Sequence, residues 1–256
     1  PLANFRSGDI AILYPQTGRD QGVLKSQIYK CTLVAINQKA VTVRLRSKQF
    51  NTSLFEGFEL WNLEHDMMDS GFNAMYRSLH AFSKAASTQR ELLLTLRPPI
   101  ENTIESVPVV SELTDEQQRI LEKAISAKEY FLLWGPPGTG KTSKMLKYFT
   151  QYILEHTSEN LLLLAYTNRA VDEICASIES IGDQVKETYL RIGNRYSTSP
   201  KYQTQLLSAK TKHVTRRNEL KEVIYNHRIF VSTVASFSSK QDLLRLKKFN
   251  RVVIDE

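Results

Sequence analysis

Cysteine and histidine are scarce in this sequence, and their spacing argues against the common metal and disulfide frameworks. The two cysteines, Cys31 and Cys175, lie far apart and fall in different expected domains. They provide neither a disulfide framework nor a set of zinc or iron–sulfur ligands. The five histidines are scattered without metal-ligand spacing. The sequence therefore predicts a protein of a reducing compartment, without a metal bound by cysteine or histidine.

Long hydrophobic runs are also absent. The longest apolar stretches, residues 131–134 and 161–166, have the length of a β-strand rather than of a membrane helix. The chain opens with Pro1 rather than methionine and has no basic-then-apolar signal segment. We expect an intracellular protein without membrane contact, cytoplasmic in a bacterium or nuclear in a eukaryote. We also expect the chain to begin inside a longer protein.

The charge is modest overall but unevenly distributed. The 256 residues carry a net charge of +7, and residues 186–251 hold fifteen Lys and Arg against four Asp and Glu. Such a block is typical of a solvated face, and it is also typical of a surface that binds a phosphate backbone. Composition alone leaves both alternatives open.

The N-terminal residues predict a small β-domain over residues 1–61, either a barrel or a sandwich. Short strands separated by turns are expected at residues 9–14, 26–36, 40–46 and 55–61. A helical spacing of apolar residues follows at Leu63, Met67, Met75, Leu79 and Phe82, with Gly71 in the middle of that helix. A second helix is expected at residues 88–96. Pro98 and Pro99 end it. We therefore expect a helical stalk and linker over residues 62–107.

The rest of the chain, residues 108–256, alternates helical and strand patterns. Helices are expected at residues 115–127, 141–156 and 169–181, and strands at residues 130–134, 160–166, 228–233 and 251–255. Such alternation predicts an α/β domain, with a parallel sheet flanked by helices.

The strongest chemical signal is the octet at residues 135–142, which has the phosphate-loop pattern of two glycines bracketing four residues before Lys-Thr. Glycines allow the backbone N–H groups to surround phosphate, and a helix N-terminus favours anions. Lys141 is expected to reach the β- and γ-phosphates, and Thr142 to hold Mg²⁺. The predicted nucleotide-binding residues are Gly135, Pro136, Pro137, Gly138, Thr139, Gly140, Lys141 and Thr142.

Two further places suit a nucleotide site. Asp255 and Glu256 follow an apolar strand, so Asp255 fits a Mg²⁺ partner and Glu256 a base that orients water. Ahead of the loop, Thr114 and Gln117 have the spacing of a capping box that starts a helix. The Gln117 amide, with a donor beside an acceptor, equally suits the edge of adenine. The sequence leaves these two roles of Gln117 open.

With these motifs in order, residues 113–256 resemble the first RecA-like domain of superfamily 1 helicases. Residues 113–117 are similar to the adenine-reading Q motif, 135–142 to motif I, 165–172 to motif Ia, 231–236 to motif Ic and 255–256 to the start of motif II. The resemblance implies ATP and Mg²⁺ as cofactors. It also implies contacts with single-stranded nucleic acid, DNA favoured over RNA, at Thr167, Asn168, Thr233 and Ser236.

The N-terminal barrel and stalk resemble the 5′-to-3′ subgroup, which includes the nonsense-mediated-decay helicase and the replication nuclease-helicase. The resemblance implies a fold of a P-loop RecA-like sheet preceded by a small β-barrel and helical stalk. The chain stops at motif II, so we expect a second RecA-like domain in the same parent chain and little hydrolysis by the fragment alone. The alternatives are a small-molecule P-loop kinase and a nucleic-acid clamp with little turnover.

Overall fold

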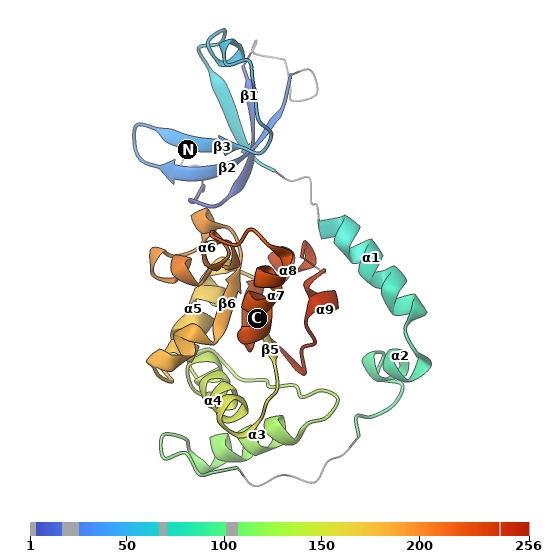
Figure 1. Ribbon diagram of the computed structural model, residues 1–256. Coiled ribbons are helices and arrows are strands. Elements are labelled where there is room, and N and C mark those ends of the chain that lie inside the picture. Colours follow the sequence, from blue (N-terminus) through green and yellow to red (C-terminus); the bar gives the residue numbers. More distant parts are fainter. Residues whose placement is uncertain (1–3, 17–25, 67–70, 101–106, 241, 256) are drawn as a thin grey trace. The chain divides into compact units, whose positions relative to one another are not determined.

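The structure, a computed structural model, describes residues 4–16, 26–66, 71–100, 107–240 and 242–255. The chain divides into two compact units (Figure 1). Unit 1 comprises Pro1–Phe72 and Asn194–Ser199, and unit 2 comprises Asn73–Gly193 and Pro200–Glu256. Among the described residues, no helix has the length and apolar character to cross a membrane.

Unit 1 is built on a four-stranded antiparallel sheet with the order β3-β2-β1-β4. Its strands are β1 (Ile10–Pro15), β2 (Tyr29–Ile36), β3 (Val41–Leu45) and β4 (Trp61–His65). Alternate side chains point to one face, where Ala11, Cys31 and Leu33 are fully buried. The predicted small β-domain is thus observed, as an antiparallel sheet with its four strands in this order.

The fourth strand was wrongly placed at residues 55–61. The chain forms a short 3-10 turn, η2 (Ser53–Phe55), and β4 begins only at Trp61, opposite Pro15 of β1. The intervening aromatic side chains pack on Trp61 instead of pairing as a strand. The ring of Phe55 lies 5.4 Å from that of Trp61, and Phe58 meets it edge-on at 5.8 Å.

The helices expected in the stalk are α1 (Gly71–Lys84) and α2 (Ser87–Leu93). The first helix begins later than its apolar spacing predicted. Leu63 lies in β4, where it pairs with Leu13 and packs against the buried core of unit 1. The described part of the helix begins at Gly71, and Met67 lies outside the described residues.

Unit 2 contains a four-stranded parallel sheet with the order β6-β7-β5-β8. The strands are β5 (Leu161–Ala165), β6 (Tyr189–Ile192), β7 (Ile229–Thr233) and β8 (Arg251–Asp255). One face is covered by α4 (Lys147–His156) and α5 (Asn168–Glu179). The other is covered by α7 (Arg217–Asn226), α8 (Val234–Ser238) and α9 (Leu243–Leu246) (Figure 1). The predicted parallel α/β fold is confirmed.

The smaller elements of unit 2 complete this layer. They are α3 (Asp115–Ser126), η4 (Asp183–Glu187), η6 (Pro200–Gln205) and α6 (Leu207–Lys210). The turn η5 (Arg195–Ser197) belongs to unit 1. Helix α3 packs through Leu121 and Ile125 against Met145 and Tyr148 at the start of α4. Its bounds match the sequence prediction closely, because the Thr114 cap and the apolar spacing are both local signals.

The strand expected at residues 130–134 does not form. Leu132 is 82% exposed and Trp134 is 92% exposed, although the apolar run predicted a buried strand. A buried strand requires partners for its backbone N–H and C=O groups. Within the described residues, β8 at the sheet edge pairs with β5 alone, and residues 130–134 do not pair with its other side.

A buried histidine joins α7 to α6. His227 Nδ1 lies 2.6 Å from the Val223 carbonyl oxygen, and Nε2 lies 3.2 Å from Lys210 Nζ. A carbonyl only accepts and an ammonium only donates, so this arrangement fits a neutral imidazole protonated on Nδ1. Burial lowers the pKa of His227, and the nearby charge of Lys210 lowers it further.

We predict that acid weakens the fold through His227. At pH values between the ordinary His pKa of about 6.5 and the lower pKa in the folded chain, His227 is protonated in the unfolded chain but neutral in the folded chain. The free energy of unfolding should therefore fall as pH drops through this window. Urea unfolding at about pH 7.5 and about pH 5.5 measures the effect. The His227→Gln variant should lose part of the pH dependence, whereas the exposed His213→Gln control should keep it. Equal pH dependence in both variants would argue against this origin.

Candidate nucleotide-binding site

The phosphate-loop sequence forms a tight loop that leads into a helix. Gly138 and Gly140 have φ angles of 83° and 86°, which residues with a side chain rarely adopt. After Gly140 the chain enters η3 (Lys141–Leu146), a wide helical turn that continues into α4. The Gly140 carbonyl accepts the N–H groups of both Lys144 and Met145, each at 2.9 Å. The loop therefore presents a helix N-terminus, a position that favours anions.

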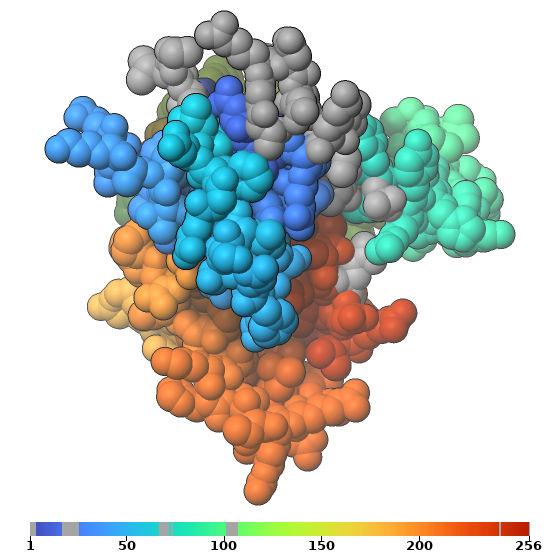
Figure 2. All heavy atoms as spheres, turned by 90° about the horizontal axis from the view of Figure 1, so that it is seen from above, coloured from blue at the N-terminus to red at the C-terminus, as the bar shows by residue number. Residues whose placement is uncertain are grey.

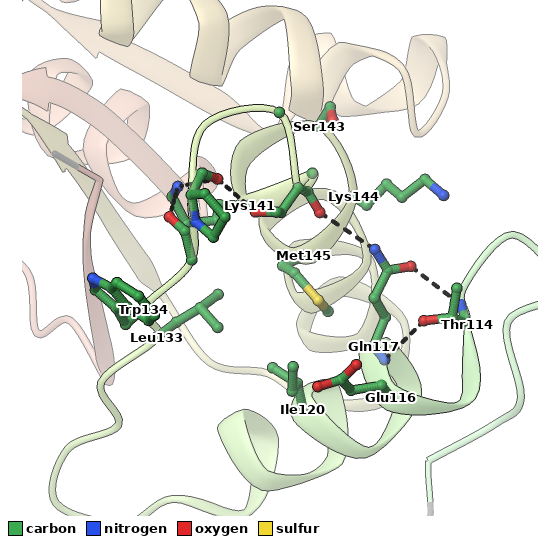
Figure 3. Close-up of a pocket in the computed structure, with 15 residues that line it drawn as sticks. Thr114, Glu116, Gln117, Ile120, Leu133, Trp134, Lys141, Ser143, Lys144 and Met145 are labelled. Carbon is green, nitrogen blue, oxygen red and sulfur yellow. Dashed lines mark hydrogen bonds between the residues drawn. The ribbon is translucent and has the colours of Figure 1, made fainter.

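The Lys141 side chain folds back across the loop (Figure 3). Its ammonium donates to the carbonyl oxygen of Gly135 at 2.5 Å and to that of Pro136 at 3.2 Å. Both partners are neutral. A phosphate oxygen in the loop would offer a charge-assisted and hence stronger partner. The arrangement places a cation where the loop would hold an anion.

Thr142 and Asp255 meet although they lie 113 residues apart in the chain. The Thr142 hydroxyl, at the start of η3, donates to Asp255 Oδ2 at 2.7 Å, at the carboxyl end of β8. A hydroxyl and a carboxylate are hard oxygen donors of the kind that Mg²⁺ prefers. The described residues contain no group of three or more His, Cys, Asp and Glu that could hold a metal ion. One hydroxyl and one carboxylate fit a Mg²⁺ that takes its other ligands from phosphate oxygens and water. Glu256 lies outside the described residues.

Gln117 connects α3 with the loop. Its Oε1 accepts the Thr114 N–H at 3.1 Å, and its own N–H donates to the Thr114 hydroxyl at 3.2 Å, which completes the capping box. Its Nε2 donates to the Thr139 carbonyl at 3.3 Å (Figure 3). Gln117 therefore forms the capping box that its spacing from Thr114 predicted. Recognition of adenine by the same amide stays a prediction.

A cavity of about 520 Å³ lies between α3 and the loop. Its size is within the usual range for a small-molecule site. Figure 3 shows side chains from α3, from the segment before the loop and from η3 around it. The walls include Trp134 and Leu133, which the sequence analysis treated only as strand residues. The position of an aromatic residue directly before the loop was the signal available for Trp134.

The four residues predicted to contact nucleic acid lie at the carboxyl ends of two neighbouring strands. Thr167 follows β5 and caps α5 by accepting the Ala170 N–H at 3.1 Å. Thr233 ends β7, caps α8, and donates to the Ser236 hydroxyl at 2.9 Å. Both threonines therefore cap helices. Thr167 is exposed and Asn168 half-buried, whereas Thr233 is only 5% exposed.

One exposed aromatic side chain beside these residues was not singled out from the sequence. Tyr166 follows β5 directly and is 80% exposed. An open aromatic ring can stack on a nucleic-acid base. Its place between a buried strand and a helix cap was the signal that could have identified it.

Comparisons with known proteins match the part of the chain that contains the phosphate loop. A family model described as an AAA domain matches residues 112–219, which include Gln117 and the phosphate loop. The chain is 27% identical over 208 residues to "DNA replication ATP-dependent helicase/nuclease JHS1" of Arabidopsis thaliana, covering 77% of this chain and 15% of that protein. It is 28% identical over 201 residues to "DNA-binding protein SMUBP-2" of Mesocricetus auratus, covering 76% of this chain and 19% of that protein.

A third relative is matched along more of the chain. "DNA replication ATP-dependent helicase/nuclease DNA2" of Saccharomyces cerevisiae is 24% identical over 250 residues, covering 92% of this chain and 16% of that protein. The chain thus spans less than a quarter of the length of each of these three relatives. These similarities confirm that the chain resembles the superfamily 1 helicases of the replication helicase/nuclease group.

Proposed function

We propose that this chain is the ATP-binding half of an ATP-dependent helicase that moves along single-stranded nucleic acid. The observation that carries the proposal is the meeting of Thr142, from the phosphate loop, with Asp255, from the far end of the sequence. This contact joins two motifs with complementary roles toward a Mg²⁺-bound triphosphate, which supports nucleotide binding. The relatives, named as ATP-dependent helicases, support the same reading.

Each residue of the site has a definite task in this mechanism. The N–H groups of the loop and the Lys141 ammonium bind the phosphates and offset the negative charge that builds up during transfer. Thr142 and Asp255 would hold Mg²⁺, which neutralises phosphate charge when bound. Glu256 follows Asp255 in the sequence and would orient the attacking water. Gln117 holds the wall of the cavity against the loop.

The fold offers a route from nucleotide to nucleic acid. The register of the sheet places Asp255, Ala165 and Thr233 at the same level on three neighbouring strands. The buried Ser177 hydroxyl of α5 also donates to the Thr142 carbonyl oxygen at 2.6 Å. A displacement of Thr142 on nucleotide binding would therefore act on α5, whose first turn begins at Thr167. That turn would touch the strand of nucleic acid.

Finer features belong to the same proposal. DNA is favoured over RNA because three relatives carry DNA in their printed names. A second RecA-like domain of the parent protein would close the site and supply the arginine that speeds phosphoryl transfer. We further propose an intracellular location, nuclear in a eukaryote, and domain borders near residues 61 and 107. No described contact favours the small-molecule kinase or the inactive clamp.

The test is hydrolysis of ATP by the intact protein, measured without nucleic acid, with single-stranded DNA, and with single-stranded RNA of matched length. We expect single-stranded DNA to raise the rate strongly and RNA to raise it less. Equal stimulation by both would remove the preference for DNA. The helicase proposal fails if neither strand changes the rate.

A further inference from the structure

The basic block of residues 186–251 separates in the structure into cations that serve the fold and cations at the surface. Arg191 is 1% exposed and forms an ion pair with Asp172. Arg228 donates to carbonyl oxygens at the end of α4, among them Ile153 at 2.9 Å. Lys247, 4% exposed, donates to the Ile224 and Tyr225 carbonyls at 3.1 Å each. These three cations are bonded to groups inside the fold, so the block is not one continuous surface for nucleic acid.

A compact part of the block remains at the surface. Three cations in the first half of α7 and just before it are exposed, and we call them the α7 basic cluster: Arg216, Arg217 and Lys221. The orange atoms of this part of the chain lie open at the surface in Figure 2. Of the two acidic residues on α7, Glu219 accepts the backbone N–H groups of Thr215 and Arg216 at 3.2 and 3.3 Å. Glu222 is exposed, so the segment keeps an excess of positive charge.

The direction of α7 places this cluster near the predicted nucleic-acid residues. The last turn of α7 lies at the amino edge of the sheet, because its Ile224 and Tyr225 carbonyls bind Lys247, shortly before β8 begins. Helix α7 packs on the sheet through Leu220, Val223 and Ile224. Its first turn therefore lies toward the opposite, carboxyl edge. Thr167, Thr233 and Asp255 lie at that same edge.

We propose that the α7 basic cluster binds the phosphates of single-stranded nucleic acid and extends the path beyond the ends of β5 and β7. The inference rests on the proposed function, which supplies the polyanionic partner. Exposed cations that neutralise phosphates release counterions, and this release drives binding.

The test is the salt dependence of binding to a fluorescent single-stranded oligodeoxythymidine, measured by anisotropy with the intact protein. The cluster variant combines Arg216→Gln, Arg217→Gln and Lys221→Gln, which keep the helix propensity of α7. For single strands the slope of log affinity against log salt is about −0.7 per phosphate contact. Three lost contacts should therefore make the slope less negative by about 2.

A matched control distinguishes the loss of phosphate contacts from a general loss of positive charge. It combines Arg119→Gln, Lys123→Gln and Lys128→Gln, three exposed cations on and just after α3, so the same charge is removed. We expect this control to keep the wild-type slope. An unchanged slope in the cluster variant, or an equal change in both variants, overturns the inference. Thermal unfolding of both variants checks that each remains folded.

Failure of the cluster and failure of the proposed function give different results. Wild-type binding with a steep salt dependence that the cluster variant retains would reject the cluster alone. A wild-type protein that binds no single strand at low salt would reject the proposed function and with it the cluster.

Discussion

The Lys141→Ala variant is expected to lose nucleic-acid-stimulated ATP hydrolysis by at least about 100-fold, the loss typical of removing one group that stabilises transition-state charge. Lys141 is the cation that the loop itself holds, between the carbonyl oxygens of Gly135 and Pro136. Its removal leaves the γ-phosphate without this partner while the glycine conformations of the loop stay intact. Steady-state hydrolysis at saturating nucleic acid, with ATP varied, measures the loss.

The control for this prediction is Lys123→Ala on the exposed face of α3, which removes the same charge outside the cavity. Its rate should stay close to that of the wild type. Near wild-type hydrolysis in the Lys141→Ala variant would mean that the loop does not hold the reacting phosphates.

The largest expected effect on stability comes from the ion pair between Asp172 on α5 and Arg191 on β6. Arg191 is 1% exposed, and its Nε and Nη2 have no hydrogen-bond partner within the described residues. The Asp172→Ala variant would leave a buried guanidinium without its counter-charge, so the free energy of unfolding should fall by about 3–5 kcal/mol. Urea unfolding followed by circular dichroism measures the change.

Two controls make the ion-pair prediction specific. The double variant Asp172→Leu with Arg191→Met should recover much of the lost stability, because an apolar pair avoids the uncompensated charge. The exposed pair Arg169 and Glu173 lies on the same helix, and Glu173→Ala should change the free energy of unfolding by about 1 kcal/mol at most. An Asp172→Ala variant as stable as the Glu173→Ala control would show that this contact contributes little.

The motifs whose signals are local could be predicted from the sequence. The phosphate loop needs glycine at particular turns, and Gly138 and Gly140 do adopt positive φ angles. The cap at Thr114 and the helix from Asp115 follow from neighbouring residues in the same way. The meeting of Thr142 with Asp255 was expected only through the combination of two motifs, and the sheet register brings them together.

Features that depend on distant partners escaped the sequence analysis. Strand β6 was missed because Arg191 interrupts its apolar run, and the charge is neutralised by Asp172 on another element. The segment at residues 130–134 has the composition of a strand but no partner among the described residues. The basic block could not be divided either, since only tertiary contacts bury Lys247 and leave Arg217 exposed.

The meeting of the loop with β8 around one Mg²⁺-bound nucleotide can be tested by nucleotide affinity measured with and without Mg²⁺. For the wild type we expect Mg²⁺ to tighten binding. The Asp255→Asn and Thr142→Val variants should lose most of that gain, and Thr142→Ser, which keeps the hydroxyl, should retain it. Lys141→Ala should bind weakly under both conditions. If Mg²⁺ tightens binding equally in the wild type and in the Asp255→Asn variant, Asp255 does not serve the nucleotide site and the account is contradicted.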